Sequence, residues 1–171
     1  MEEINWYYRR DEYGWLSNFW RAPQVMAVPA YYIAHGGGLP SEYIDNDGPT
    51  IMTFLSNENW YQANKAYHPA TFMWIASAPH PYLAMMAGRA LRPDSSNPLR
   101  RFRSNWDSVR TEVMLAGLRT KFAKGGELAG KLLATGKVAL HEDSPTDMYW
   151  GKKGKDMLGK LLMQVREELR S

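Results

Sequence analysis

The sequence contains no cysteine, which excludes disulfide bonds, thiolate metal ligands and thiol nucleophiles. It has no run approaching the roughly 18 apolar residues that a membrane-spanning helix needs. The start of the chain, residues 1–3, lacks the basic and apolar regions of a signal peptide, so we expect a cytosolic protein, or a nuclear one in a eukaryote. The four histidines show no metal-ligand spacing and HExxH is missing, so we expect neither a metal site nor a cofactor.

The residues that are present describe a globular chain. Of 171 residues, 44% are hydrophobic and 23% charged, and this length allows one domain over residues 1–171. A net charge of +3 gives only a weak general attraction to polyanions. Six arginines nevertheless lie between Arg89 and Arg110, in a stretch whose acids are Asp94 and Asp107. Such a patch could bind phosphates, and a solvated loop and helix face explains it equally well.

Hydrophobic periodicity predicts an α+β fold, rich in helices and with a small sheet, because helical and strand patterns do not alternate strictly. Turn residues, including three consecutive glycines, predict an exposed loop over about 31–50. The predicted strands are 3–8, one or two between 24 and 33, and 138–140; the predicted helices are 57–67, short ones from Pro69 and Pro81, then 105–123, 127–134 and 157–169.

One candidate functional cluster lies on the helix predicted from Asn57. Glu58, Tyr61, Gln62 and Lys65 are spaced i, i+3, i+4 and i+7, so they share one helical face. An acid, an amine, an aromatic ring and an amide on one wall of a pocket would suit catalysis. An ordinary polar helix surface accounts for the same spacing.

A second cluster lies in the loop that contains Asp147, Tyr149, Trp150 and Gly151. A carboxylate next to two large aromatic side chains, outside any amphipathic period, suits a planar ring stacked beside a catalytic acid. Aromatic side chains that plug the core explain the pattern as well.

The third cluster contains Gly14, Ser17, Asn18 and Phe19 in an aromatic loop near the N-terminus. An asparagine offers donors and acceptors for sugar hydroxyls or a base edge. A local turn that uses the Asn18 side chain is the competing explanation.

Together the clusters resemble the YbiA-like family, also called NADAR for its link to NAD and ADP-ribose. Two departures stand out: the family often has His where this chain has Asn59, and the loop over about 31–49 is longer than in compact members. The matching stretches, in order, are 13–19, 56–65, 88–89, 103–107, 121–122, 135–136, 142–151 and 158–166.

The resemblance implies an N-glycosidase that cleaves a bond between a ribose anomeric carbon and a base nitrogen. The implied substrates are ADP-ribose attached to guanine, in a nucleotide or nucleic acid, and ribose-phosphate intermediates of riboflavin synthesis. A module that binds ADP-ribose or nucleotides without cleaving them is the third hypothesis.

The implied roles leave two choices open. Asp147 or Glu58 would stabilise the positive charge that develops on the ribose. Lys65 would form a Schiff base with the sugar if its pKa is low enough, and direct attack by water is the alternative. The residues expected to bind substrate are Arg9, Gly14, Ser17, Asn18, Phe19, Tyr61, Gln62, Arg89, Trp106, Tyr149, Trp150 and Gly151.

Overall fold

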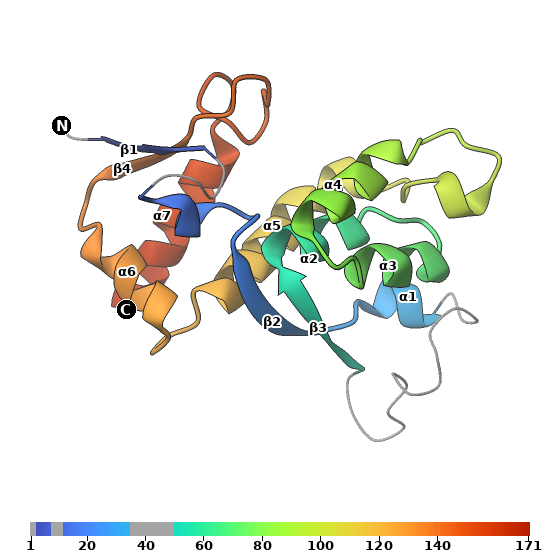
Figure 1. Ribbon diagram of the computed structural model, residues 1–171, viewed down its shortest axis with the longest axis horizontal. Coiled ribbons are helices and arrows are strands. Elements are labelled where there is room, and N and C mark those ends of the chain that lie inside the picture. The colour runs from blue at the N-terminus through green and yellow to red at the C-terminus, as the bar shows by residue number, and fades with distance from the viewer. Residues whose placement is uncertain (1–2, 8–11, 35–49) are drawn as a thin grey trace. The chain divides into compact units, whose positions relative to one another are not determined.

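The computed structural model describes residues 3–7, 12–34 and 50–171 (Figure 1). Arg9 and residues 35–49 of the expected exposed loop lie outside the described residues. The chain divides into two compact units: a central unit, Arg21–Met114, and a terminal unit, Met1–Trp20 with Leu115–Ser171. The boundary falls within helix α5 (Trp106–Lys121). No described helix is both long and apolar enough to cross a lipid bilayer.

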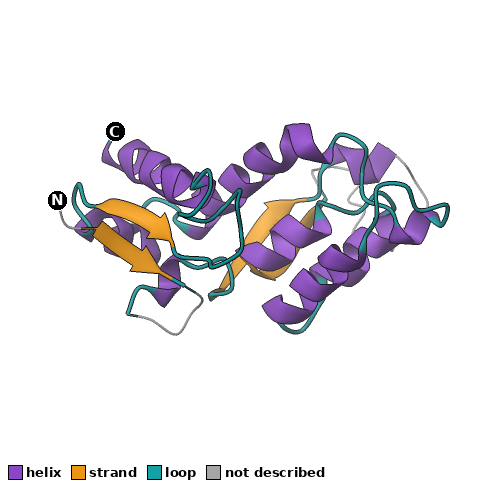
Figure 2. Ribbon diagram, turned by 90° about the horizontal axis from the view of Figure 1, so that it is seen from above, coloured by secondary structure: helices purple, strands orange, loops and turns teal. Residues whose placement is uncertain are grey.

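The α+β class is confirmed, and the strands of the described residues form two separate pairs rather than one small sheet (Figure 2). One antiparallel pair belongs to the central unit, and one parallel pair belongs to the terminal unit. Besides the start of α5, the central unit contains β2 (Arg21–Ala27), α1 (Ala30–Ala34), β3 (Ile51–Ser56), α2 (Asn57–Ala63), α3 (Pro69–Ala76) and α4 (Pro81–Ala90).

Strands β2 and β3 each turn alternate side chains inward. Met26 of β2 and both Met52 and Phe54 of β3 are buried, whereas Val25 and Ile51 are exposed. This period of two is typical of a sheet with one covered face. Strand β3 was not predicted, and residues 30–33, predicted as strand, are helical in α1.

Helix α2 is buried along its whole length and packs against both α3 and α4. Its N-cap is Ser56 rather than the expected Asn57: the Ser56 hydroxyl accepts a hydrogen bond from the N–H of Asn59. The helix ends at Ala63, four residues before the predicted end. Beyond that point the backbone pairs with the segment 101–103, and the Asn64 amide caps the last turn by donating to the Trp60 carbonyl.

The starts of α3 and α4 use the same local device. His68 and His80 each accept a hydrogen bond at Nδ1 from the N–H two residues later. A proline follows each histidine at the first helical position, where its missing N–H costs nothing. The predicted helices at Pro69 and Pro81 are therefore confirmed.

The terminal unit is built around a parallel pair of short strands and a long amphipathic helix. Besides the end of α5, its elements are β1 (Glu3–Trp6), a 3₁₀ turn (Gly14–Leu16), α6 (Glu127–Ala134), β4 (Ala139–Glu142) and α7 (Met157–Arg170). Helix α7 packs on β4, and α6 packs on α7 (Figure 1).

Helix α7 confirms its predicted apolar face. Leu158, Leu161, Leu162 and Val165 follow the i, i+3, i+4, i+7 spacing and are all buried. The helix approaches β4 closely because Gly159 has no side chain: a Cβ there would lie 2.1 Å from the carbonyl oxygen of Leu140. This packing anchors the loop between β4 and α7, which contains Asp147.

Candidate active site

Glu58 and Gln62 form a buried hydrogen-bonded pair on α2. Glu58 lies in the first helical turn, where the helix dipole stabilises a negative charge. One turn later, Gln62 donates from Nε2 to Glu58 Oε1 over 2.8 Å. Glu58 is 6% exposed and Gln62 is 7% exposed. The hydrogen bond therefore compensates part of the cost of removing a carboxylate from water.

Lys65 lies just beyond α2, so the expectation that it shares a helical face with Glu58 is wrong. The helix ends at Ala63, and the Lys65 carbonyl accepts a hydrogen bond from the N–H of Arg103 instead of continuing the helix. The half-buried side chain places Nζ 5.8 Å from the centre of the Phe102 ring. Within the described part of the chain, Nζ has no hydrogen-bond acceptor.

The surroundings of Lys65 lower its pKa below the ordinary value for lysine. Burial is the largest cause, and the nearby positive charges of Arg89 and Arg92 act in the same direction. The negative charges of Glu58 and Asp107 oppose the shift without cancelling it. A lowered pKa increases the fraction of neutral amine, which is the nucleophilic form of lysine.

The aromatic residues of this cluster contact each other. Tyr61 of α2 and Trp106, the first residue of α5, place their ring centres 5.0 Å apart at a tilted angle. Both side chains are buried. The role of this pair in stacking on a base stays a prediction.

The arginine-rich segment is divided between internal and surface roles. Arg89, in the last turn of α4, and Arg100 are exposed. The arginines held by neighbouring side chains are Arg101, over the Tyr67 ring at 4.5 Å, Arg103, over the Tyr31 ring at 4.3 Å, and Arg110, 3.5 Å from Asp107. Part of the patch thus stabilises the fold, and Arg89 combines exposure with proximity to Lys65.

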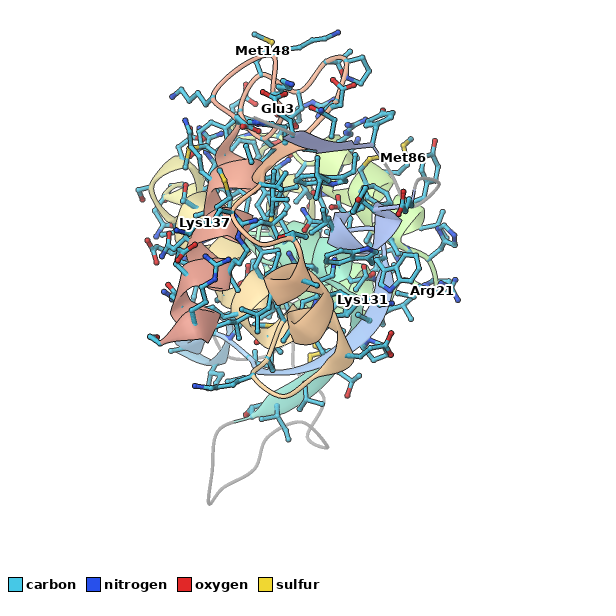
Figure 3. All side chains as sticks on the ribbon, turned by 90° about the vertical axis from the view of Figure 1, so that its left-hand side faces the viewer. Glu3, Arg21, Met86, Lys131, Lys137 and Met148 are labelled. Carbon is cyan, nitrogen blue, oxygen red and sulfur yellow. The ribbon has the colours of Figure 1, made fainter. Side chains whose placement is uncertain are left out.

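In the terminal unit, Asp147 is bound to the backbone of its own loop. Its Oδ1 accepts hydrogen bonds from the N–H groups of Tyr149 (2.9 Å) and Trp150 (2.8 Å). The rings of these two residues meet edge to face, 4.9 Å apart, and Trp150 is buried. Met148, which precedes these two residues, is exposed and points away from the ribbon (Figure 3). Asp147 therefore holds the aromatic loop in shape.

Gly151 is required by close packing. A Cβ there would lie 2.7 Å from the Asp147 carbonyl oxygen, which already accepts the Gly151 N–H. The N–H groups of Lys152, Gly154 and Lys155 likewise donate to carbonyl groups of the protein. A phosphate at this loop would consequently meet lysine side chains rather than these backbone amides.

The N-terminal motif forms a 3₁₀ turn whose residues Gly14 and Leu16 are buried. Ser17 closes the turn, and its hydroxyl accepts the N–H of Phe19. Asn18 is 8% exposed. Ser17, Asn18 and Phe19 thus lie in one tight turn of the terminal unit.

Lys121, at the end of α5, is a buried lysine to which the sequence assigned no role. Its Nζ donates to the Ser17 carbonyl over 2.7 Å, and its side chain is 6% exposed. Burial lowers the pKa of Lys121 to about 7. The sequence did contain a signal of this burial. Lys121 lies seven residues after Met114 and three after Leu118, so it falls on the buried face of α5.

Asn59 and Gly88 make packing contacts around helix α2 of the central unit. The Asn59 side chain, which replaces the frequent His, donates to the carbonyl of Ala78 over 2.9 Å and so ties α2 to the end of α3. Gly88 on α4 lies against the Gln62 side chain. No three histidine, aspartate or glutamate side chains gather as a metal site within the described ranges.

A lysine of lowered pKa can act as a nucleophile, and a nearby carboxylate can stabilise positive charge that develops during a reaction. The chain belongs to the NADAR domain family, whose model matches residues 6–170. It is 36% identical to N-glycosidase YbiA of Escherichia coli (strain K12) over 170 residues, which cover 97% of this chain and 88% of that protein.

Two further comparisons extend the family relationship. The NMR structure of the E. coli protein YbiA superposes with a TM-score of 0.72 at 33% identity, covering 99% of this chain and 87% of that one. Over 71 residues, the chain is 45% identical to the riboflavin biosynthesis protein VVA0006 of Vibrio vulnificus (strain YJ016), which is 39% of this chain and 19% of that protein. Family membership and these relatives support a hydrolase that acts on N-glycosyl bonds.

Proposed function

We propose that this protein hydrolyses the bond between ribose and guanine in ADP-ribosylated guanine, with Lys65 as the nucleophile. The observation that carries the proposal is the lowered pKa of Lys65 next to the buried pair of Glu58 and Gln62. Membership of a family with relatives named N-glycosidases supports the reaction class. The exposed Arg89, close enough to affect Lys65, supports a substrate that carries a pyrophosphate.

In the first step the neutral amine of Lys65 attacks the anomeric carbon of the ribose. A carbon–nitrogen bond to Lys65 forms, and the bond to guanine breaks. Guanine leaves with the bonding electron pair and takes a proton from solvent. Positive charge develops on the ribose, and the Glu58 carboxylate stabilises it.

The second step opens the sugar ring. The ring oxygen leaves the anomeric carbon and takes the proton of the new amine, so that Lys65 forms a protonated Schiff base. Water then adds to this carbon, Lys65 leaves as the free amine, and one proton returns to solvent, balancing the proton that guanine took up. The released sugar then closes again. The net reaction consumes one water molecule per bond cleaved.

Glu58 is a better candidate than Asp147 for stabilising the ribose. Asp147 accepts two backbone N–H groups of its own loop, whereas Glu58 lies close enough to Lys65 for its negative charge to oppose the lowering of the pKa of that lysine. We assign Asp147 a structural role instead, because its hydrogen bonds hold the loop that contains Tyr149. Its catalytic role stays a prediction.

The test is release of ADP-ribose from DNA that carries ADP-ribosylated guanine, measured by liquid chromatography and mass spectrometry. We expect turnover by the wild-type chain, and borohydride added during turnover should attach the sugar to Lys65. If excess protein releases no ADP-ribose and yet binds the modified DNA, the protein is a binding module and the proposal is overturned.

The second candidate reaction uses a ribose-phosphate intermediate of riboflavin synthesis. The similarity to the protein named riboflavin biosynthesis protein favours it, and it requires the same Lys65 and Glu58 chemistry on a smaller substrate. Turnover of that intermediate, without release of ADP-ribose from modified guanine, would decide for this reaction.

A further inference from the structure

A glycine lies directly against the carboxamide of Gln62. Gly88 is on α4, and a Cβ built there would lie 1.9 Å from Gln62 Oε1 and 2.8 Å from Gln62 Cδ. Side chains do not approach a Cβ so closely. The carboxamide therefore occupies space that only a glycine leaves open.

The orientation of this carboxamide follows from its other neighbour. Nε2 donates to the Glu58 carboxylate, whereas Oε1 is buried and has no hydrogen-bond partner in the described part of the chain. An inverted amide would set two oxygens against each other, so the carboxylate determines which way the amide lies. One hydrogen bond and one steric contact, with Gly88, hold Gln62 in place.

We propose that Gln62 is a positioning residue for Glu58, and that Gly88 is required because it lets Gln62 reach the carboxylate. The inference rests on the proposed function, in which Glu58 faces the positively charged ribose. A donor on the carboxylate favours its ionised form and helps to fix its orientation. Without that donor, a larger fraction of molecules has a neutral Glu58 at a given pH.

Gln62→Met tests the hydrogen bond, because methionine has a similar volume and no donor. Because the reaction needs Glu58 ionised and Lys65 neutral, the acid side of the kcat against pH profile has two steps. We expect the step that belongs to Glu58 to move up by about one pH unit, the size expected for a hydrogen bond to a charged group. At pH values below that step, kcat should fall about tenfold with little change in KM. Gln164→Met is the matched control: Gln164 donates to Glu168 over 2.9 Å on the exposed face of α7, and its loss should change neither parameter.

Gly88→Ala tests the steric contact. The added methyl group displaces the Gln62 carboxamide, so the Glu58 step of the pH profile should move in the same direction as in Gln62→Met. Gly130→Ala on α6 is the control, because a Cβ there meets no atom within 4 Å. A Gly88→Ala profile that coincides with the wild-type profile would contradict the role of Gly88.

A measurement without substrate separates this inference from the proposed function. The ¹³C chemical shift of the Glu58 carboxyl, assigned with Glu58→Gln, is followed against pH in wild type and Gln62→Met. A higher titration midpoint in Gln62→Met supports positioning even if neither substrate is turned over. An unchanged midpoint, or a rise in KM without a shift of the pH profile, overturns the inference and makes Gln62 a substrate contact or a structural residue.

Discussion

Each unit of the protein combines a carboxylate with a lysine of lowered pKa, and the two combinations are bound differently. In the terminal unit, Asp147 accepts backbone N–H groups and Lys121 donates to the backbone carbonyl of Ser17. In the central unit, Glu58 accepts from a side chain, and Lys65 has no acceptor among the described residues. The charged groups of the terminal unit thus bond to backbone groups, whereas in the central unit Glu58 bonds to the Gln62 side chain and Lys65 Nζ lies over the Phe102 ring.

A lowered pKa therefore does not identify a nucleophile by itself. Burial is the main cause for both lysines. Lys121 is 6% exposed and bonded to Ser17, whereas Lys65 is half-buried. Of these two lysines, Lys65 alone combines a lowered pKa with partial exposure and the lack of a backbone acceptor for Nζ among the described residues, and this combination favours it as the proposed nucleophile.

The largest expected effect comes from replacing Lys65. Lys65→Arg keeps the positive charge but removes a neutral amine, because the guanidinium group stays protonated. We expect kcat to fall at least about 10³-fold, the size typical for loss of a covalent nucleophile. Single-turnover assays on ADP-ribosylated guanine DNA would measure it, with circular dichroism to confirm folding.

Lys121→Met is the control for that experiment. It removes the other lysine of lowered pKa, and it should keep the borohydride-trapped adduct that Lys65→Met loses. If Lys65→Arg keeps activity within about tenfold of wild type, Lys65 is not the nucleophile and direct attack by water is favoured.

Replacing either carboxylate should lower kcat less than replacing Lys65, and the two replacements should differ from each other. Glu58→Gln removes the charge that stabilises the ribose, and we expect kcat to fall about 10²-fold. Asp147→Asn keeps an oxygen that accepts the Tyr149 and Trp150 N–H groups, so kcat should stay within about tenfold of wild type. Steady-state kinetics on the preferred substrate would provide both values.

Asp147→Ala completes this comparison. It removes the acceptor as well as the charge, so urea unfolding should show a loss of about 1 kcal/mol that Asp147→Asn does not show. If Asp147→Asn instead loses as much activity as Glu58→Gln, Asp147 is a catalytic carboxylate and its charge does more than hold the loop.

Local patterns predicted much of the fold. The helices at 127–134 and 157–169 were found within a few residues, because apolar spacing and flanking glycines specify them. Strand β3 was missed, since it runs without a turn into α2 at Ser56. The early end of α2 was missed because it depends on pairing with residues 101–103, which lie far along the chain.

The candidate site was predictable in its residues and only partly in its geometry. The i, i+4 spacing of Glu58 and Gln62 implied their contact, because a helix fixes it. The place of Lys65 beyond the helix end, and the contact of Gly88 with Gln62, arise from tertiary packing that no local pattern contains. The two-unit division was likewise absent from the pattern, which suggested one domain over 1–171.

A further expected effect is on stability rather than activity, and it concerns Lys121. The pKa falls from 10.5 to about 7 on folding, so between these pH values the unfolded chain binds a proton that the folded chain does not. The free energy of unfolding should therefore rise with pH across this window, by on the order of 1 kcal/mol per pH unit. Below pH 7 both states are protonated, and the cost of burying the charge is fully present.

Urea unfolding of wild type and Lys121→Met at several pH values from 6 to 10 would test this. Methionine carries no charge, so the stabilising effect of the substitution should be constant up to about pH 7 and shrink above it. Lys65 also has a lowered pKa and adds a rise of the same sign, which Lys65→Met isolates. Parallel curves for wild type and Lys121→Met would mean that Lys121 keeps its proton in the fold, and that the bond to Ser17 is held by an ammonium group throughout.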